Sequence, residues 1–170
     1  MTTASWAVDL SHSPLADKIR FLEAHASENV LLDVTCFHAT DLYARYPQLK
    51  ATCSTLLSLN GKCELHSPEH FDAAAELLRE RGFSAVRTTL TTPGFVVART
   101  MATIINEAYF TLEEEVATAE DIDRAMLFGV NYPAGPIAWA KGREGVVREL
   151  LATLEGMTGD VRYRSSRLLK

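Results

Sequence analysis

The chain has 170 residues, of which 47% are apolar and 23% are charged, and its formal net charge is −5. A chain of this size and composition forms one or two small globular domains that bury a hydrophobic core. Its acidic balance gives no reason to expect nucleic acid or an anionic membrane as a partner, and no apolar run approaches the length of a membrane span.

The cysteines and the N-terminus bear on the cellular compartment. Cys36, Cys53 and Cys63 are odd in number and lack C-x-x-C spacing, so we expect reduced, half-buried thiols. A zinc site is not expected, because four ligands at metal spacing are absent. The first residues lack the basic start and apolar core of a signal peptide. Together these features predict a cytoplasmic protein.

The first half of the chain alternates short apolar runs with amphipathic segments. We expect strands at 6–10, 29–35, 51–59, 62–65 and 83–90, and helices at 14–26, 40–46 and 69–81. Pro47 ends the second helix, Asn60 and Gly61 form a turn between two strands, and Gly82 ends the third helix. Strands that alternate with helices predict βαβ units and a mostly parallel sheet.

A long helix is expected at 93–115. Apolar residues recur along it at spacings of three and four, at Val97, Met101, Ile104, Ala108 and Leu112. Pro93 suits a first helical turn, and the helix would be about 34 Å long. We expect it to separate an α/β domain, residues 1–90, from an all-helical domain, residues 91–170.

Two further helices are expected in the second half. Thr118 is a good N-cap, with Glu120 and Asp121 in the first turn, and Gly129 ends that helix. Residues 130–136 then form a constrained loop with two prolines, and a last amphipathic helix covers 143–154. The basic tail is expected to be a solvated end docked by Leu168 and Leu169.

The first half lacks a phosphate-binding loop. A dinucleotide-binding domain begins with a strand, the pattern G-x-G-x-x-G and a helix, because backbone N–H groups must approach the pyrophosphate closely. That pattern is absent from the chain, and the first half has only Gly61 and Gly82. We therefore expect the second part of a Rossmann domain without its phosphate-binding part, and no cofactor on this chain.

Four motifs resemble the C-terminal domain of the 3-hydroxyacyl-CoA dehydrogenase family, in the right order. They are Pro93-Gly94-Phe95-Val96-Val97-Ala98-Arg99, Glu107-Ala108, Glu120-Asp121-Ile122-Asp123 and Gly129-Val130-Asn131-Tyr132-Pro133-Ala134-Gly135-Pro136. The chain also resembles the C-terminal copies of tandem 3-hydroxybutyryl- and 3-hydroxyadipyl-CoA dehydrogenases, which join a reduced Rossmann half to this domain. The resemblance implies a truncated Rossmann-like α/β half followed by an all-α dehydrogenase domain.

The resemblance also implies the positions of the family's site residues. The family uses NAD and a His–Glu pair, in which the His takes the hydroxyl proton and the Glu orients it. Glu64 matches the Glu, but the stretch 51–58, where the His would lie, contains none. Ala98 replaces the family's Asn, while Arg99 is kept. The family's Ser falls near Thr35 or Cys36, and Tyr132 and Pro133 would lie near the substrate cleft.

These departures leave alternatives open. Glu64 is either a remnant of the pair or a surface carboxylate at a strand end, and the loop of Tyr132 and Pro133 is either part of a cleft or a structural corner. His38 follows a strand, where α/β sheets often place ligands, yet a lone loop His is usually polar surface. His66 and His70 flank Pro68, which argues against a metal pair.

Three functions fit this pattern. The first is an auxiliary member of the family in fatty or aromatic acid breakdown, which lacks its own NAD site and catalytic His. Such a protein would form a homodimer through the helical domain, as the resemblance implies, or pair with a complete dehydrogenase; Asn106, Glu107 and Tyr109 would be satisfied inside the interface. The second is an active NAD-dependent oxidoreductase completed by a partner chain. The third is a module that binds a CoA thioester.

Overall fold

The computed structural model describes residues 5–170. It divides the chain into an α/β unit that ends at Ala98 and a helical unit that runs from Arg99 to Lys170, and each is described here by itself. Among residues 5–170 we find no helix with both the length and the apolar character needed to cross a membrane.

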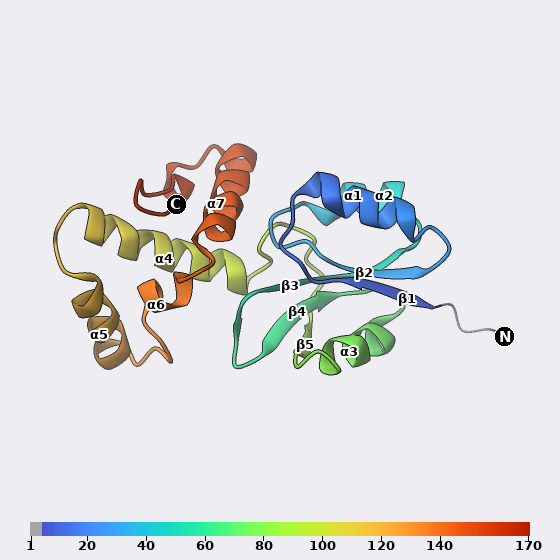
Figure 1. Cartoon of the computed structure of the whole chain (residues 1–170), viewed down its shortest axis with the longest axis horizontal. Helices are drawn as coiled ribbons and strands as arrows, with labels where there is room; N and C mark the ends of the chain where they lie inside the picture. The colour runs from blue at the N-terminus through green and yellow to red at the C-terminus, as the bar shows by residue number, and fades with distance from the viewer. Residues whose placement is uncertain (1–4) are drawn as a thin grey trace. The chain divides into compact units, whose positions relative to one another are not determined.

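The α/β unit contains one five-stranded sheet, shown in Figure 1. Its elements are β1 (Trp6–Asp9), α1 (Leu15–Ala24), β2 (Asn29–Asp33), α2 (Ala39–Arg45), β3 (Leu49–Leu59), β4 (Lys62–His66), α3 (Phe71–Arg79) and β5 (Ser84–Arg87). The strands follow chain order across the sheet. β1, β2 and β3 are parallel, β4 is antiparallel to β3, and β5 is parallel to β4. The prediction of a mostly parallel sheet is confirmed.

Both faces of the sheet are covered by helices, α1 and α2 on one face and α3 on the other (Figure 1). The alternation of side chains along β2 explains this arrangement. Val30 and Leu32 pack in the cluster that includes residues of α1 and α2, whereas Leu31 packs with Ala74 and Leu78 of α3. A strand buried on both faces reads as a continuous apolar run, as residues 30–32 do.

The predicted helix at 93–115 is shorter than expected. The helix α4 covers Val97–Glu113, which makes it about 26 Å long. Gly94 and Phe95 before it have φ angles of 72° and 44°, in the left-handed region, so residues 93–96 form a turn. Phe95 is 2% exposed and packs in the core cluster beside α1 and α2. The expectation that Pro93 begins the helix is therefore wrong.

Two other boundaries differ from the sequence prediction. The last strand ends at Arg87 instead of Leu90. The helix expected at 69–81 is α3, Phe71–Arg79, and Ser67 accepts a hydrogen bond from the His70 N–H just before it. Gly82, with a φ of 84°, closes the turn after the helix as expected.

The helical unit continues from α4 with α5 (Ala119–Gly129), α6 (Pro136–Ala140), α7 (Glu144–Thr158) and the 3-10 turn η1 (Val161–Tyr163). The predicted cap of α5 is confirmed, since the Thr118 side chain accepts a hydrogen bond from the Asp121 N–H. Gly159 adopts the left-handed conformation that ends α7. The buried residues of α7 are Val147, Leu150, Leu151 and Leu154, on the face that the periodicity predicts.

The C-terminal segment is tied to α4 by polar side chains. Asn106 is 1% exposed, donates to the Arg164 carbonyl at 2.8 Å and accepts from the Ser166 N–H at 2.9 Å. Glu113 accepts from the Ser166 hydroxyl at 2.6 Å and from the Arg167 N–H at 2.9 Å. The expectation that Asn106 needs an interface to be satisfied is thus wrong, because the tail of the same chain satisfies it. Leu169 is buried at this end, as expected.

Candidate functional site

Glu64 binds the start of helix α4. Its carboxylate, on β4, accepts hydrogen bonds from the Val97 N–H at 2.8 Å and from the Val96 N–H at 3.0 Å. The first N–H groups of a helix have no partner within the helix and carry a partial positive charge, so a carboxylate is a strong acceptor there. The Glu64 residue is 8% exposed, which means that the alternative of a surface carboxylate is wrong.

The residue opposite Glu64 in the sheet is Ser54. The two are register partners of the antiparallel pair β3–β4, and Ser54 lies within the stretch in which the resemblance implies a His. The Ser54 hydroxyl is 2.9 Å from the Thr35 hydroxyl. A serine hydroxyl lacks the pKa near 7 that suits a general base, so this pair does not reproduce a His–Glu arrangement.

A buried carboxylate, Asp33, lies at the carboxyl end of β2. Asp33 is 1% exposed. Its oxygens accept from the Thr35 N–H at 2.8 Å, from the Thr55 N–H at 2.8 Å and from the Thr55 hydroxyl at 2.6 Å. Burial raises the pKa of Asp33, but the proximity and charge of His12, with the hydrogen bonds from Thr55 and Thr35, outweigh it and leave the pKa below its ordinary value. The group is built to stay ionised.

Two basic side chains lie beside this carboxylate. The His12 Nε2 atom is 3.2 Å from the Thr55 hydroxyl and 3.6 Å from Asp33 Oδ2. Lys18 is completely buried, and its Nζ atom donates to the Ser11 carbonyl at 2.6 Å and to Asp9 Oδ2 at 3.1 Å. The carboxyl ends of parallel strands are the usual ligand-binding edge of an α/β sheet. In this chain that edge is lined by an internal polar network.

Sequence reasoning missed this network. Asp9 and Asp33 are the last residues of two adjacent parallel strands, and polar side chains at such ends converge at one edge of the sheet. His12 follows β1 by three residues, and so it occupies the same kind of position after a strand as His38. The signal was therefore present in the sequence at position 12.

The other predicted site residues of the α/β unit take local partners. Thr35 and Cys36 follow β2 and are buried, and Ala98 is fully buried in the first turns of α4. His38 caps α2 by accepting from the Thr40 N–H. The assignment of Thr35 and Cys36 to a substrate cleft stays a prediction.

The histidines that flank Pro68 are also used locally. His66 Nδ1 is 3.2 Å from the Thr88 carbonyl, and the His70 ring packs edge-on against Trp6. We find no cluster of three potential metal ligands within residues 5–170.

In the helical unit, Arg99 is held by Tyr163. The Arg99 Nε atom donates to the Tyr163 hydroxyl at 2.9 Å, and the guanidinium carbon is 5.2 Å from the centre of its ring. This pairing ties the start of α4 to η1. A role for Arg99 in a substrate cleft stays a prediction.

The loop that carries Tyr132 and Pro133 is pinned by Asp123 of α5. The Asp123 carboxylate accepts from the Ile137 N–H at 2.8 Å and from the Ala138 N–H at 3.0 Å, at the start of α6. The Tyr132 ring packs against Trp139, with 5.8 Å between the ring centres. These contacts give the loop a structural function as a corner between helices, whatever else it contacts.

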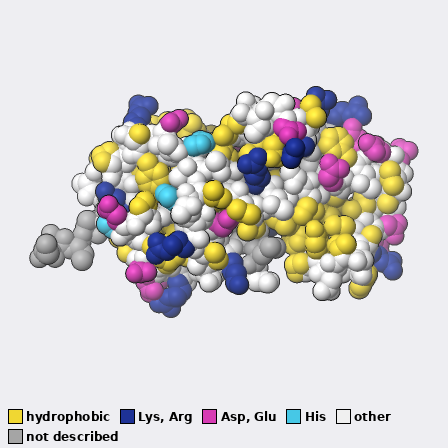
Figure 2. Space-filling view, turned by 180° about the vertical axis from the view of Figure 1, so that it is seen from behind, with side chains coloured by type: hydrophobic (Ala, Val, Ile, Leu, Met, Phe, Trp, Pro, Cys, Tyr) yellow, Lys and Arg dark blue, Asp and Glu magenta, His cyan; other side chains and the backbone are white. Residues whose placement is uncertain are grey.

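An apolar groove of about 450 Å³ lies between α4 and α5. Hydrophobic side chains gather on this face of the helical unit in Figure 2. The groove has small and medium apolar residues along its length and two acidic residues among its lining, which comprises Thr103, Ile104, Glu107, Ala108, Thr111, Ala117, Asp121, Ile122, Ala125, Met126 and Pro136.

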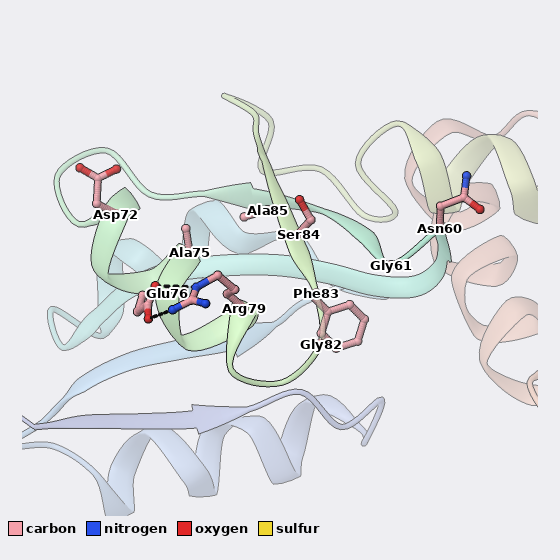
Figure 3. Close-up of a pocket in the computed structure, with 10 residues that line it drawn as sticks. All are labelled: Asn60, Gly61, Asp72, Ala75, Glu76, Arg79, Gly82, Phe83, Ser84 and Ala85. Carbon is pink, nitrogen blue, oxygen red and sulfur yellow. Dashed lines mark hydrogen bonds and ion pairs between the residues drawn. The ribbon is translucent and has the colours of Figure 1, made fainter.

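A second hollow, on the α/β unit beside α3 and β5, is drawn in Figure 3. It measures about 460 Å³ and is lined by the turns at Gly61 and Gly82 and by the ion pair of Glu76 and Arg79. Both of these charged side chains are more than half exposed. An exposed ion pair next to two turns offers no convergent chemistry, so this hollow is not the candidate site.

Comparison with known proteins identifies the class of the helical part. The 3-hydroxyacyl-CoA dehydrogenase C-terminal domain family matches residues 94–170. The 3-hydroxyadipyl-CoA dehydrogenase of Escherichia coli K12 is 48% identical over 80 residues, which cover 46% of this chain and 17% of the relative. A 3-hydroxybutyryl-CoA dehydrogenase of Clostridioides difficile is 36% identical over 108 residues, 62% of this chain and 38% of the relative.

Solved structures agree on the fold. The (S)-3-hydroxybutyryl-CoA dehydrogenase of Ralstonia eutropha superposes with a TM-score of 0.77 over 97% of this chain and 63% of that chain, at 22% identity. The 3-hydroxybutyryl-CoA dehydrogenase of Escherichia coli K12 has a TM-score of 0.69 and 30% identity over 82% of this chain and 30% of that chain.

These matches place residues 94–170 in the 3-hydroxyacyl-CoA dehydrogenase C-terminal domain family, and the preceding residues share the fold of the solved family structures. The predicted family and the predicted fold class, an α/β half followed by the helical dehydrogenase domain, are both confirmed. The chain spans less than two fifths of the length of the two curated relatives quoted, so the activity of those whole enzymes does not transfer to it directly.

Proposed function

We propose that this chain is an auxiliary member of the 3-hydroxyacyl-CoA dehydrogenase family in acyl-CoA breakdown. It does not oxidise substrate by itself, and its helical unit pairs with another helical unit of the same kind, in a second copy or in a complete dehydrogenase. The observation that carries the proposal is that the Glu64 carboxylate accepts hydrogen bonds from the backbone at the start of α4. Cys53 and Cys63, as buried thiols, suit the reducing cytoplasm.

Three features support the absence of oxidation. The Glu64 carboxylate accepts hydrogen bonds from the Val96 and Val97 N–H groups, and its register partner in the sheet is Ser54, not a histidine. The sequence lacks the glycine loop that dinucleotides need. At the carboxyl ends of β1–β3, the space bounded by residues such as His12, Lys18 and Asp33 is too small for a water molecule, so these residues do not fit NAD as they stand.

The surface of α5 supports pairing. Phe128 is 82% exposed, and it lies two helical turns after Asp121, on the same side of α5 as the groove. Arg124 lies one turn before Phe128. A second copy would bring an aromatic ring to the groove between α4 and α5 and a cation to its acidic residues Glu107 and Asp121. Because each copy would supply both the exposed Phe128 ring and the groove that receives it, the two copies would pair about a two-fold axis.

The pairing is tested by sedimentation of the whole chain at micromolar concentrations. We expect a dimer for the wild type and a monomer for Phe128→Asp. The control is Val161→Asp, which changes another exposed apolar residue, on η1, and should leave the dimer intact. A wild type that stays monomeric both alone and with a complete dehydrogenase would refute the pairing.

The absence of oxidation is tested by turnover of acetoacetyl-CoA with NADH. We expect none with the chain alone. Turnover by the chain alone would refute this part of the proposal, and a rate above that of a complete dehydrogenase when the two are mixed would establish an oxidoreductase completed by a partner. A rise in melting temperature with the CoA thioester, without NADH, would identify the third function, a thioester-binding module.

A further inference from the structure

The segment between β1 and α1, residues 10–14, crosses the carboxyl edge of the sheet. It is anchored near its start, where the Ser11 N–H donates to Asp9 Oδ1 at 2.8 Å and the Ser11 carbonyl accepts from Lys18 at 2.6 Å. From its middle, His12 reaches over to β2 and β3, where its Nε2 atom lies beside Asp33 and Thr55. Leu10, at the start of the segment, packs against the apolar cluster that includes Leu31 and Cys53. The imidazole adds a polar contact between the middle of the segment and the neighbouring strands.

Beneath this segment lies a polar floor, which we define as Asp33, Thr35, Ser54 and Thr55. Thr35 and Ser54 share a hydroxyl–hydroxyl hydrogen bond, and Asp33 accepts from Thr55 and from the Thr35 N–H. All four residues are buried. Residues 10–14 thus close an edge at which an α/β sheet usually binds its ligand.

The charges around the floor single out His12. Lys18, from α1, pairs with Asp9 at 3.1 Å. Cys36, after β2, lines the same small space as His12 and Asp33. Cys53, on β3, packs in the apolar cluster with α3, and burial raises its pKa well above the ordinary value, so that thiol stays neutral. His12 is the cationic group within ion-pair distance of Asp33 among the described residues. A buried carboxylate without a nearby cation is costly.

We propose that residues 10–14 are a lid over the polar floor, which His12 holds closed while its imidazole is protonated and releases when the proton is lost. Histidine is the side chain that ordinarily changes charge between about pH 5 and 8. Loss of the proton removes the attraction to Asp33 and leaves the hydrogen bond to Thr55, so the closed state weakens without unfolding the sheet. This inference does not rest on the proposed function.

The test is amide hydrogen exchange of the whole chain, followed by NMR at about pH 5.5 and about pH 8. The reporters are the Thr35 and Thr55 amides, which donate to Asp33. Rates are corrected for the intrinsic effect of pH and divided by that of Leu65 in β4, which reports opening of the sheet as a whole. In the wild type we expect protection of the reporters to fall about fivefold at the higher pH, the order of a partly exposed ion pair.

Three variants separate the charge from the fold. His12→Lys keeps a cation at both pH values and should hold the higher protection throughout, whereas His12→Gln should show the lower protection throughout. His38→Asn removes another imidazole while keeping an N-cap for α2, and should respond to pH as the wild type does. Equal protection of wild type at the two pH values, or a wild-type response in His12→Lys or His12→Gln, would overturn the proposal. If His12→Gln does not fold, the wild type and His12→Lys still decide it.

Discussion

Asp123 fills the space beside Gly135, so that a β-carbon at position 135 would lie 2.1 Å from the Asp123 Cγ atom. From this position Asp123 accepts the N–H groups of Ile137 and Ala138. Glu64 has the same relationship to Val96 and Val97. Two helices, α6 and α4, therefore begin on carboxylates supplied by earlier segments of the chain, and this shared device leads to the first two predictions.

Substitution of Gly135 by Ala should destabilise the chain. The new methyl group would force Asp123 from the start of α6, and overpacking of this kind costs about 1–3 kcal/mol. The measurement is urea unfolding of the whole chain. Gly156→Ala is the matched control, because its β-carbon meets nothing within 4 Å and a helical Gly→Ala change adds about 0.5–1 kcal/mol. Equal stability of Gly135→Ala and wild type would contradict the structure.

Removal of the Glu64 carboxylate should weaken the start of α4. Glu64→Ala leaves two N–H groups without their acceptor and should cost about 1–3 kcal/mol of unfolding free energy. Glu64→Gln keeps an oxygen acceptor and should lose about 0.3–1 kcal/mol, the attraction between a charge and the helix dipole. Glu69→Ala, an exposed neighbour, should change little. If Glu64→Ala were as stable as Glu69→Ala, the capping role assigned to Glu64 would be wrong.

The buried thiols should be unreactive in the folded chain. Burial raises the pKa of Cys63 from 9.0 to about 11, which lowers its thiolate fraction near neutral pH about a hundredfold. Labelling of Cys63 with a thiol reagent should therefore be slower by that factor or more than in urea. Because the unfolded thiol ionises near 9.0 and the folded one does not, the folded state should lose stability as the pH rises above that value. Rapid labelling of the native Cys63 would rule this out.

The C-terminal segment should loosen in acid. The hydrogen bonds from the Ser166 hydroxyl and from Arg167 lower the pKa of Glu113 below 4.5. A lowered carboxyl pKa stabilises above the unfolded value, and the contribution disappears as the pH falls through the folded one. Glu113→Gln imitates the protonated state, so trypsin should cut after Arg167 faster in this variant at neutral pH. Glu114→Gln is the control, and equal cutting of the two variants would refute the contact.

Much of the fold follows from local patterns, but the start of α4 does not. Strand β2 is buried on both faces and reads as an apolar run, and Thr118 caps α5 as its position before Glu120 and Asp121 predicts. Phe95, in contrast, adopts a left-handed φ that a bulky residue rarely takes. Its conformation depends on a space in the sheet core and on Glu64, which accepts the N–H of the next residue, Val96, from 32 positions earlier in the chain. Neither is visible in the local sequence.

The site shows the same division. The resemblance located Glu64, yet its hydrogen-bond partners are backbone groups, which a motif does not encode. His12 and Asp33 are 21 residues apart and meet because β1 and β2 are adjacent parallel strands. The strand order of the sheet, rather than any spacing along the chain, brings this pair together.

At the turn of Gly94 and Phe95, the boundary of the family match differs from the boundary of the folded α/β unit. The family match begins at residue 94, but Phe95 fills the core of the α/β unit. A polypeptide divided at the similarity limit would leave that core with a void the size of a phenyl ring, at a cost of about 3–5 kcal/mol. Any exchange of helical domains between relatives must therefore keep the Pro-Gly-Phe turn with the sheet that it completes.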